Sequence, residues 1–174
     1  MKVTAVTAPA TVTWNGATST DWATGTNRDN TLGPAQSDTA GINSGTALFS
    51  TGTSVALNSL QLVGGTMTIS GGTFNATNSS SKDSWVDGTL ICTGGTTKFN
   101  ELEIGRTTCK SGSLVISGGD VSVTRSLSGN SLYLGGNRGV TNAGTGNFTV
   151  LGSAATQIGI GAANIDTDGT MACM

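Results

Sequence analysis

A glycine-bounded pattern occurs four times in the 174-residue chain, and it limits the available folds more than any other feature. The pattern reads Gly, any residue, apolar, any, apolar, any, Gly, and then Gly or Ser. Its starts are 23, 24 and 34 residues apart, a spacing typical of solenoids, in which each repeat stacks on the next. The four copies are GTMTISGGTFNAT from residue 65, GTLICTGGTTKFN from 88, GSLVISGGDVSVT from 112 and GNFTVLGSAATQI from 146.

The two apolar positions of the pattern, the third and the fifth, are two residues apart. On a β-strand such residues face the same side, because successive side chains point to opposite faces. We predict that this side forms the core of the protein. The predicted core residues are Met67, Ile69, Leu90, Cys92, Leu114, Ile116, Phe148 and Val150.

Further short strands fill the rest of each repeat. Apolar residues follow the double glycine, as Val121 and Val123 do, and another pair precedes a later glycine, as in SLQLVGG, ELEIGR and SLYLGG. Glycine suits a corner because it adopts positive φ without a Cβ clash. The sequence therefore predicts an all-β protein, a right-handed parallel β-helix (β-solenoid) of about five coils of three short strands each. The double glycine is expected to turn the corner between two faces of one coil.

The repeat also suggests how the chain is divided. Residues 1–38 are predicted to be an N-terminal opening or capping segment, and residues 39–174 to be the solenoid repeats. Two polar stretches break the period, near 75–87 and near 135–147. We expect both to be loops inserted between coils, where solenoids commonly vary.

The chain has few charged residues, and this reduces the number of partner classes that it could bind. Charged residues make up 10% of the sequence and the net charge is −2, against roughly 25% charged residues in typical soluble domains. Without a basic cluster we expect no nucleic-acid partner, and without a long apolar run no membrane span. Histidine is absent, which removes the commonest general base. We expect no catalytic residue, no bound metal and no cofactor, and the Thr/Ser-rich surface suggests an extracellular or cell-surface location.

The repeat and the opening segment are similar to those of a known group of proteins. The stretch GSLVISGGDVSVTRSLSGNSLYLGGNRG resembles repeats in secreted bacterial parallel β-helix proteins, namely autotransporter-like passengers and surface proteins anchored by a sorting tag. The opening, TWNGATSTDWATGTN followed by Pro34 and SDTAGINSG, resembles the segment that often precedes such repeats, although Arg28 stands where a tryptophan is usual. The resemblance implies a structural role outside the cell or at its surface, with no shared catalytic residues to transfer. The residues that match the opening are Trp14, Trp22, Asn27, Asp38, Ala40 and Ile42.

Parallel β-helices also include polysaccharide-degrading enzymes, whose sites need converging carboxylates. Glu101 and Glu103 alternate along one strand and are expected on its outer face near Arg106, where a surface charge cluster is the favoured interpretation. The stretch DTDGT at 166–170 resembles part of a calcium loop but lacks the distal carboxylate that completes one. Outward threonines do not form the regular ladder that ice binding would need. An enzyme is therefore the third hypothesis for the function.

Tryptophans are the candidate sugar contacts, because aromatic rings combine an apolar face with a polar edge. Trp14 and Trp22 lie in the opening segment, where they either cover the end of the first coil or contact sugars. Trp85 ends a polar insertion and is the preferred candidate for a glycan contact. A glycan-binding surface module is thus the second hypothesis.

The first hypothesis is an extracellular structural protein, adhesive or filament-forming, that self-associates end to end. The C-terminal stretch still reads as strand, with Ile158 and Ile160, and has no evident cap. Because unpaired strand edges promote association, we predict contacts through this coil, with Cys173 near the junction. Three cysteines cannot all pair within one chain; Cys92 is expected to be a core residue, and a Cys92–Cys109 disulfide is the rival.

Overall fold

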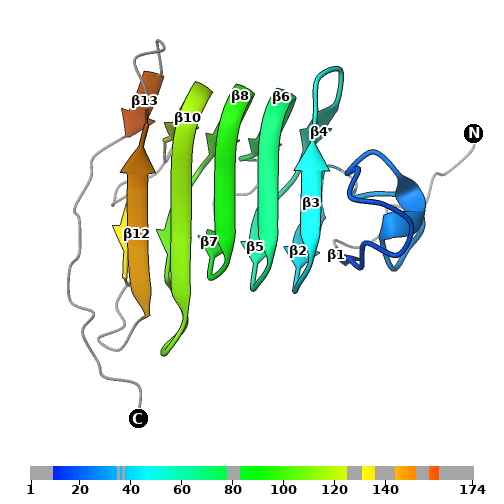
Figure 1. Cartoon of the computed structure of the whole chain (residues 1–174), viewed down its shortest axis with the longest axis horizontal. Helices are drawn as coiled ribbons and strands as arrows, with labels where there is room; N and C mark the ends of the chain where they lie inside the picture. The colour runs from blue at the N-terminus through cyan, green and yellow to red at the C-terminus, as the bar shows by residue number, and fades with distance from the viewer. Residues whose placement is uncertain are drawn as a thin grey trace, which may run out of the picture.

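The computed structural model describes residues 10–34, 36, 38–77, 83–124, 131–135, 144–151 and 157–160, the last of these as backbone only. This part of the chain is all-β and built from parallel sheets (Figure 1). Its one helical element is a single 3-10 turn, η1 (Gly25–Asn27), in the segment after the first strand. The all-β prediction is thus confirmed at the level of parallel strands arranged in two sheets.

The first sheet, called here the A sheet, has six short parallel strands. Each strand pairs with the A strand of the previous repeat, so the order in the sheet follows the chain. In sheet order these are β1 (Thr11–Trp14), β2 (Thr39–Ile42), β5 (Ser59–Leu62), β7 (Ser84–Val86), β9 (Leu102–Ile104) and β11 (Leu132–Leu134).

The second sheet, the B sheet, contains the glycine-bounded repeats and is also parallel. Its five-strand path runs β12, β10, β8, β6 and β3, while β4 pairs with β6 and β13 with β10 (Figure 1). One A strand and the B strand or strands that follow it are called a layer below. The B strands are β3 (Thr46–Phe49), β4 (Ser54–Ala56), β6 (Thr66–Ala76), β8 (Thr89–Phe99), β10 (Ser111–Val123), β12 (Thr145–Val150) and β13 (Gln157–Ile160).

The double glycines lie inside long strands instead of separating two strands. β6, β8 and β10 each run through their glycine pair, and the pairing register shifts there, as between Ile116 and Asp120 of β10. The second glycine of each pair has positive φ, +80° at Gly119, and a Cβ there would lie 2.6 Å from the Gly95 carbonyl oxygen. The glycines therefore bend a continuous strand and let neighbouring layers approach, which corrects the expectation of separate short strands at this point.

One hydrophobic core lies between the two sheets. Residues at the two predicted apolar positions are paired from layer to layer, so their side chains form two columns. Met67, Ile69, Leu90, Cys92, Leu114 and Ile116 are buried, and Phe148 is half-buried but packs against this core.

Val150 was expected in the core, and this expectation is wrong. It pairs with the buried Ile116, so it occupies the inward register, yet it is 44% exposed. The cause is its place in the stack: β12 is the last strand of its sheet path, and within the described residues no further strand pairs with its outer edge. The pattern identifies the inward side correctly but does not show which layer is the last of those that the structure describes.

The opening segment covers the other end of the stack. The rings of Trp14 and Trp22 are stacked with centroids 5.9 Å apart, and Trp22 also meets the edges of Phe49 and Phe74. Both tryptophans are buried. The Trp22 amide donates a hydrogen bond to the Leu48 carbonyl of β3, and the Leu48 amide donates one to the Thr20 carbonyl. The structure thus places these rings in the covering role, where a sugar cannot stack on them.

Arg28, which stands where the resemblance leads one to expect a tryptophan, completes this cover. Its guanidinium lies 4.6 Å from the centroid of the Trp22 ring and donates a hydrogen bond to the Trp22 carbonyl. Burial lowers the pKa of Arg28, and the nearby Asp21 carboxylate opposes that shift. Arg28 therefore packs on the Trp22 ring and donates a hydrogen bond to the backbone of the same residue.

Candidate functional site

The outer face of the A sheet holds a row of polar and aromatic side chains. Parallel pairing places Gln61, Trp85, Glu103 and Tyr133 in one row across β5, β7, β9 and β11. Trp85, the predicted glycan contact, is half-buried in this row. The same alternation that directs Leu102 and Ile104 into the core directs Glu103 to the other side of the sheet.

Arg106 links two members of this row. Its guanidinium carbon lies 4.4 Å from the centroid of the Trp85 ring, and its Nη1 lies 3.2 Å from Oε2 of Glu103. A cation above an indole ring is attracted by the negative face of the ring. One face of Trp85 is thus already occupied by a side chain of the same protein, which leaves less of the ring for a sugar.

Glu101 and Glu103 were expected to form a surface cluster, but both are buried. Trp85, Tyr133 and Arg106 flank Glu103, so lying on the outer side of a strand does not mean contact with solvent here. Strand alternation predicts on which face of the sheet a side chain lies, but it does not predict which other side chains cover that face.

Asp83 joins these two glutamates to form a compact acidic group. One carboxylate oxygen from each of Asp83, Glu101 and Glu103 lies within 4.8 Å of the others. Oxygen ligands at such spacing suit hard cations, and paired carboxylates at similar distances serve glycoside hydrolysis. Both uses require access from solvent, and the burial of the two glutamates restricts it. No motif singles out Asp83 in the sequence, because two strands, β7 and β8, separate it from Glu101 along the chain.

The turn after β9 is fixed to the preceding layer. The Thr107 amide and hydroxyl both donate hydrogen bonds to the Asp87 carboxylate, and Lys110 N donates to the Thr107 carbonyl. Cys109 lies in this turn with a left-handed backbone, φ +63°. A rigid support therefore holds Cys109 at the corner that leads into β10.

The cysteines divide into two chemical environments. Cys92 is buried and free, its thiol approaches the Thr97 hydroxyl, and burial raises its pKa to about 11. A thiol with so high a pKa is a weak nucleophile at neutral pH. Cys109 is in a disulfide. Because Cys92 is free, the rival hypothesis of a Cys92–Cys109 disulfide is wrong.

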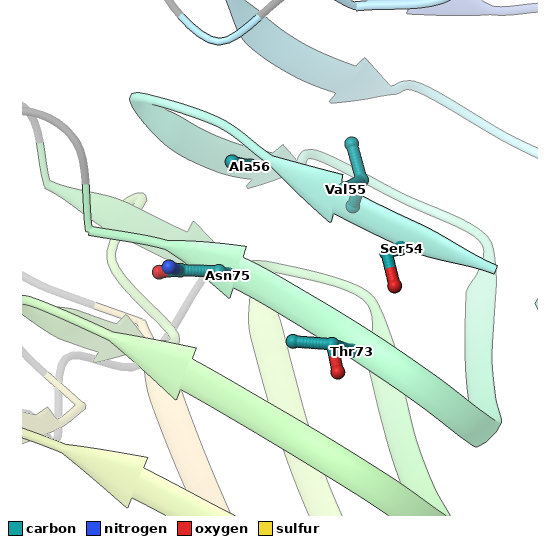
Figure 2. A pocket seen from close by; sticks show the side chains of 5 residues that line it. All are labelled: Ser54, Val55, Ala56, Thr73 and Asn75. Atoms are coloured by element: carbon teal, nitrogen blue, oxygen red, sulfur yellow. The ribbon is translucent and has the colours of Figure 1, made fainter.

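An open hollow of about 300 Å³ lies beside β4, at the N-terminal end of the stack (Figure 2). Val55 pairs with the buried Phe74, and it packs against the core while remaining only partly buried. No motif in the sequence marks this hollow, because its lining residues come from two separate strands, β4 and β6. The lining residues are Ser54, Val55, Ala56, Thr73 and Asn75.

Some predicted positions cannot be placed. The backbone of β13 pairs with β10, but the side chains of Ile158 and Ile160 lie outside the described residues, as do Cys173 and the DTDGT stretch at 166–170. Among the described residues there is no helix of the length and apolarity that a bilayer crossing requires.

No protein-family model, curated protein or solved structure matches the chain.

Proposed function

We propose that the chain is an extracellular structural protein, a right-handed parallel β-helix whose rods associate end to end into filaments or adhesive assemblies. The parallel pairing of successive layers supports this proposal, because a stack of coils can be continued by any further strand in the same register. The disulfide at Cys109 supports an oxidising compartment, where such bonds form and persist.

The observation that carries the proposal is the exposed apolar surface of the last layer among the described residues. Val150 holds an inward position and is 44% exposed, and Leu151 beside it is 51% exposed. Strand edges of this kind pair readily with another chain, and burying apolar side chains there is favourable.

The opposite end offers a complementary surface. Leu32, in the opening segment, is 82% exposed, and Leu48 of β3 is 37% exposed. In the described part of the chain, four of the five exposed large apolar side chains lie at the two ends of the stack, the exception being Val63. Contact between two different ends is heterologous, and unless its rotation closes into a ring it propagates into a filament.

Sedimentation velocity over a concentration series in the presence of reductant tests the proposal. We expect the wild-type protein to form larger species as concentration rises, and Leu151→Glu to remain monomeric because it places a charge on the contact. Val63→Glu is the matched control, since it adds the same charge to an exposed apolar position between β5 and β6, away from both ends. A wild-type protein that stays monomeric at all concentrations would contradict the proposal.

Glycan binding is the second proposal, and it depends on Trp85. The half-buried ring and the polar row around it support a sugar contact, while the stacked Arg106 reduces the available face. A glycan array probed with wild type and with Trp85→Ala tests this second function. Glycan binding by wild type that is lost in Trp85→Ala supports it. A polysaccharide-degrading enzyme is less well supported, because Glu101 and Glu103 are buried.

A further inference from the structure

The dipeptide Asn15-Gly16 lies in the opening segment, directly after β1, and both of its residues are exposed. Asn15 is the only asparagine of the sequence that precedes a glycine. We propose that Asn15 deamidates spontaneously in the folded protein, and that the product loosens the opening segment from the end of the stack. This inference goes beyond the proposed function and does not depend on self-association.

Deamidation of this pair requires no reactant other than water, because the attacking atom belongs to the neighbouring residue and the reaction is intramolecular. The backbone nitrogen of Gly16 attacks Cγ of Asn15. A C–N bond forms and the Cγ–Nδ2 bond breaks, so that ammonia leaves with the proton of the Gly16 amide. Water then opens the resulting succinimide. Opening at the side-chain carbonyl gives aspartate, and opening at the main-chain carbonyl gives isoaspartate, in which the chain continues through Cγ.

The local structure holds the two reacting groups on the same side. The Ala17 amide donates a hydrogen bond to Oδ1 of Asn15 at 3.0 Å, which is an Asx turn, in which the asparagine side chain folds over the following peptide unit. This turn keeps the carboxamide on the side of the Gly16 nitrogen, as an intramolecular attack requires. Gly16 has φ +58° and no Cβ, so no side chain of its own shields that nitrogen.

One hydrogen bond opposes the attack, and it is the longer of a pair. The Asn15 and Gly16 amides both donate to the Asn27 carbonyl, at 2.8 and 3.3 Å respectively. The Gly16 bond is longer than the usual N–H···O range of about 2.7–3.2 Å, so it restrains the nitrogen only weakly. Exposed segments with few buried contacts also open locally at a low free-energy cost. The Gly16 nitrogen is therefore released for attack without unfolding of the stack.

Asp87-Gly88 offers the same backbone chemistry under restraint. The Asp87 carboxylate is buried and accepts hydrogen bonds from the amide and the hydroxyl of Thr107. The Gly88 carbonyl accepts a hydrogen bond from the Ser113 amide, which ties the dipeptide to the next layer. A carboxylate is also a poorer electrophile than a carboxamide. We expect no succinimide at Asp87, and this position is an internal reference for Asn15.

Isoaspartate at position 15 disturbs the ribbon that residues 13–16 form with residues 27–29. Its main chain is one methylene longer, which moves Gly16 out of register with the Asn27 carbonyl. Trp14, the preceding residue, pairs with Arg28 in an antiparallel bridge and stacks on Trp22. Loss of the adjoining hydrogen bond weakens this bridge, so the two stacked rings become more accessible to water.

Peptide mapping of full-length wild type, incubated folded at mildly alkaline pH, tests the modification. We expect isoaspartate at Asn15 to accumulate several times faster than at Asn43, which is also exposed but is followed by Ser44. No isoaspartate is expected at Asp87. Asn15→Ser is the matched control, because a serine hydroxyl can accept the same turn hydrogen bond but cannot form a succinimide.

Hydrogen exchange and tryptophan fluorescence of the same samples test the loosening. In aged wild type we expect several-fold faster exchange of the backbone amides in residues 13–29 and emission at longer wavelength, whereas aged Asn15→Ser should keep its initial values. An intact Asn15 at a time when Asn43 has reacted overturns the site. Conversion of Asn15 with unchanged exchange and emission overturns the loosening, and so does an equal change in aged Asn15→Ser.

Discussion

Ile116 and Val150 are register partners in adjacent parallel strands, yet Ile116 is fully buried and Val150 is 44% exposed. Both occupy the same position of the glycine-bounded pattern, so the difference arises only from what lies on the next layer. The pair therefore separates two contributions to stability: the inward position itself and the coverage by a neighbour.

Truncating these two residues should reveal that difference. Ile116→Ala removes buried methyl groups and leaves a void, and is expected to lower the free energy of unfolding by about 2–5 kcal/mol. Val150→Ala, at the uncovered end, is expected to cost less than about 1 kcal/mol. Urea denaturation at low protein concentration measures both, with the outward Val115→Ala as a further reference. Equal losses at all three positions would show that the inward assignment is wrong.

Two glycines with nearly equal φ test why the double glycine is needed. Gly119 has φ +80° and a Cβ there would lie 2.6 Å from the Gly95 carbonyl oxygen, whereas Gly45 has φ +79° with nothing within 4 Å. Alanine at either position incurs the left-handed backbone cost, about 1–2 kcal/mol. Only Gly119→Ala adds a clash with the neighbouring layer, so it should lower the midpoint of thermal unfolding much further. Similar midpoints for the two variants would mean that close approach of the layers is not the reason for glycine.

The Cys92 thiol should make stability depend on alkaline pH. Burial raises its pKa from 9.0 to about 11 in the folded protein, so the stabilising contribution is complete below pH 9 and is lost as the pH rises through about 11. A two-unit difference corresponds to about 2–3 kcal/mol. The free energy of unfolding of wild type should fall by about this amount relative to Cys92→Val between these pH values. Parallel pH profiles for the two proteins would contradict the burial of the thiol.

Arg106 should stabilise the buried carboxylate on the outer face of the A sheet. Arg106→Met removes the cation 3.2 Å from Glu103 Oε2 and is expected to cost about 1–3 kcal/mol, because the buried carboxylate is left without its ion-pair partner. Adding Glu103→Gln should recover part of that loss, since the remaining side chain is uncharged. The exposed Lys98→Ala is the control for removing a cation. Chemical denaturation of the single and double variants, read as a mutant cycle, gives the coupling; a coupling of zero would mean that the ion pair is not formed in solution.

Much of the fold could be predicted from the sequence because the pattern of residues at a period of two is a direct consequence of strand geometry. Leu114 and Ile116 are separated from Val115 by that alternation alone, and the structure buries the first two. The strand boundaries could be predicted less well from the sequence. A glycine pair such as Gly118 and Gly119 reads as a break, but its backbone still pairs with β8 through a register shift.

The site could be predicted less well, because it depends on contacts between distant parts of the chain. Glu103 alternates with core residues, which indicates an outward side chain, but Trp85 and Arg106 pack around it. Asp83 joins Glu101 and Glu103 only because β7 and β9 are neighbours in the sheet. Which side chains cover a face of a sheet is a property of the whole stack, and no local motif encodes it.

Electron microscopy of the reduced protein at high concentration tests the central claim most directly. If rods associate end to end, the images should show unbranched particles whose lengths are multiples of one rod, with a layer spacing of about 4.8 Å along the axis. Leu151→Glu should show single rods only, and Val63→Glu should resemble wild type. Single rods in all three samples, or rods associated side by side, would contradict end-to-end assembly.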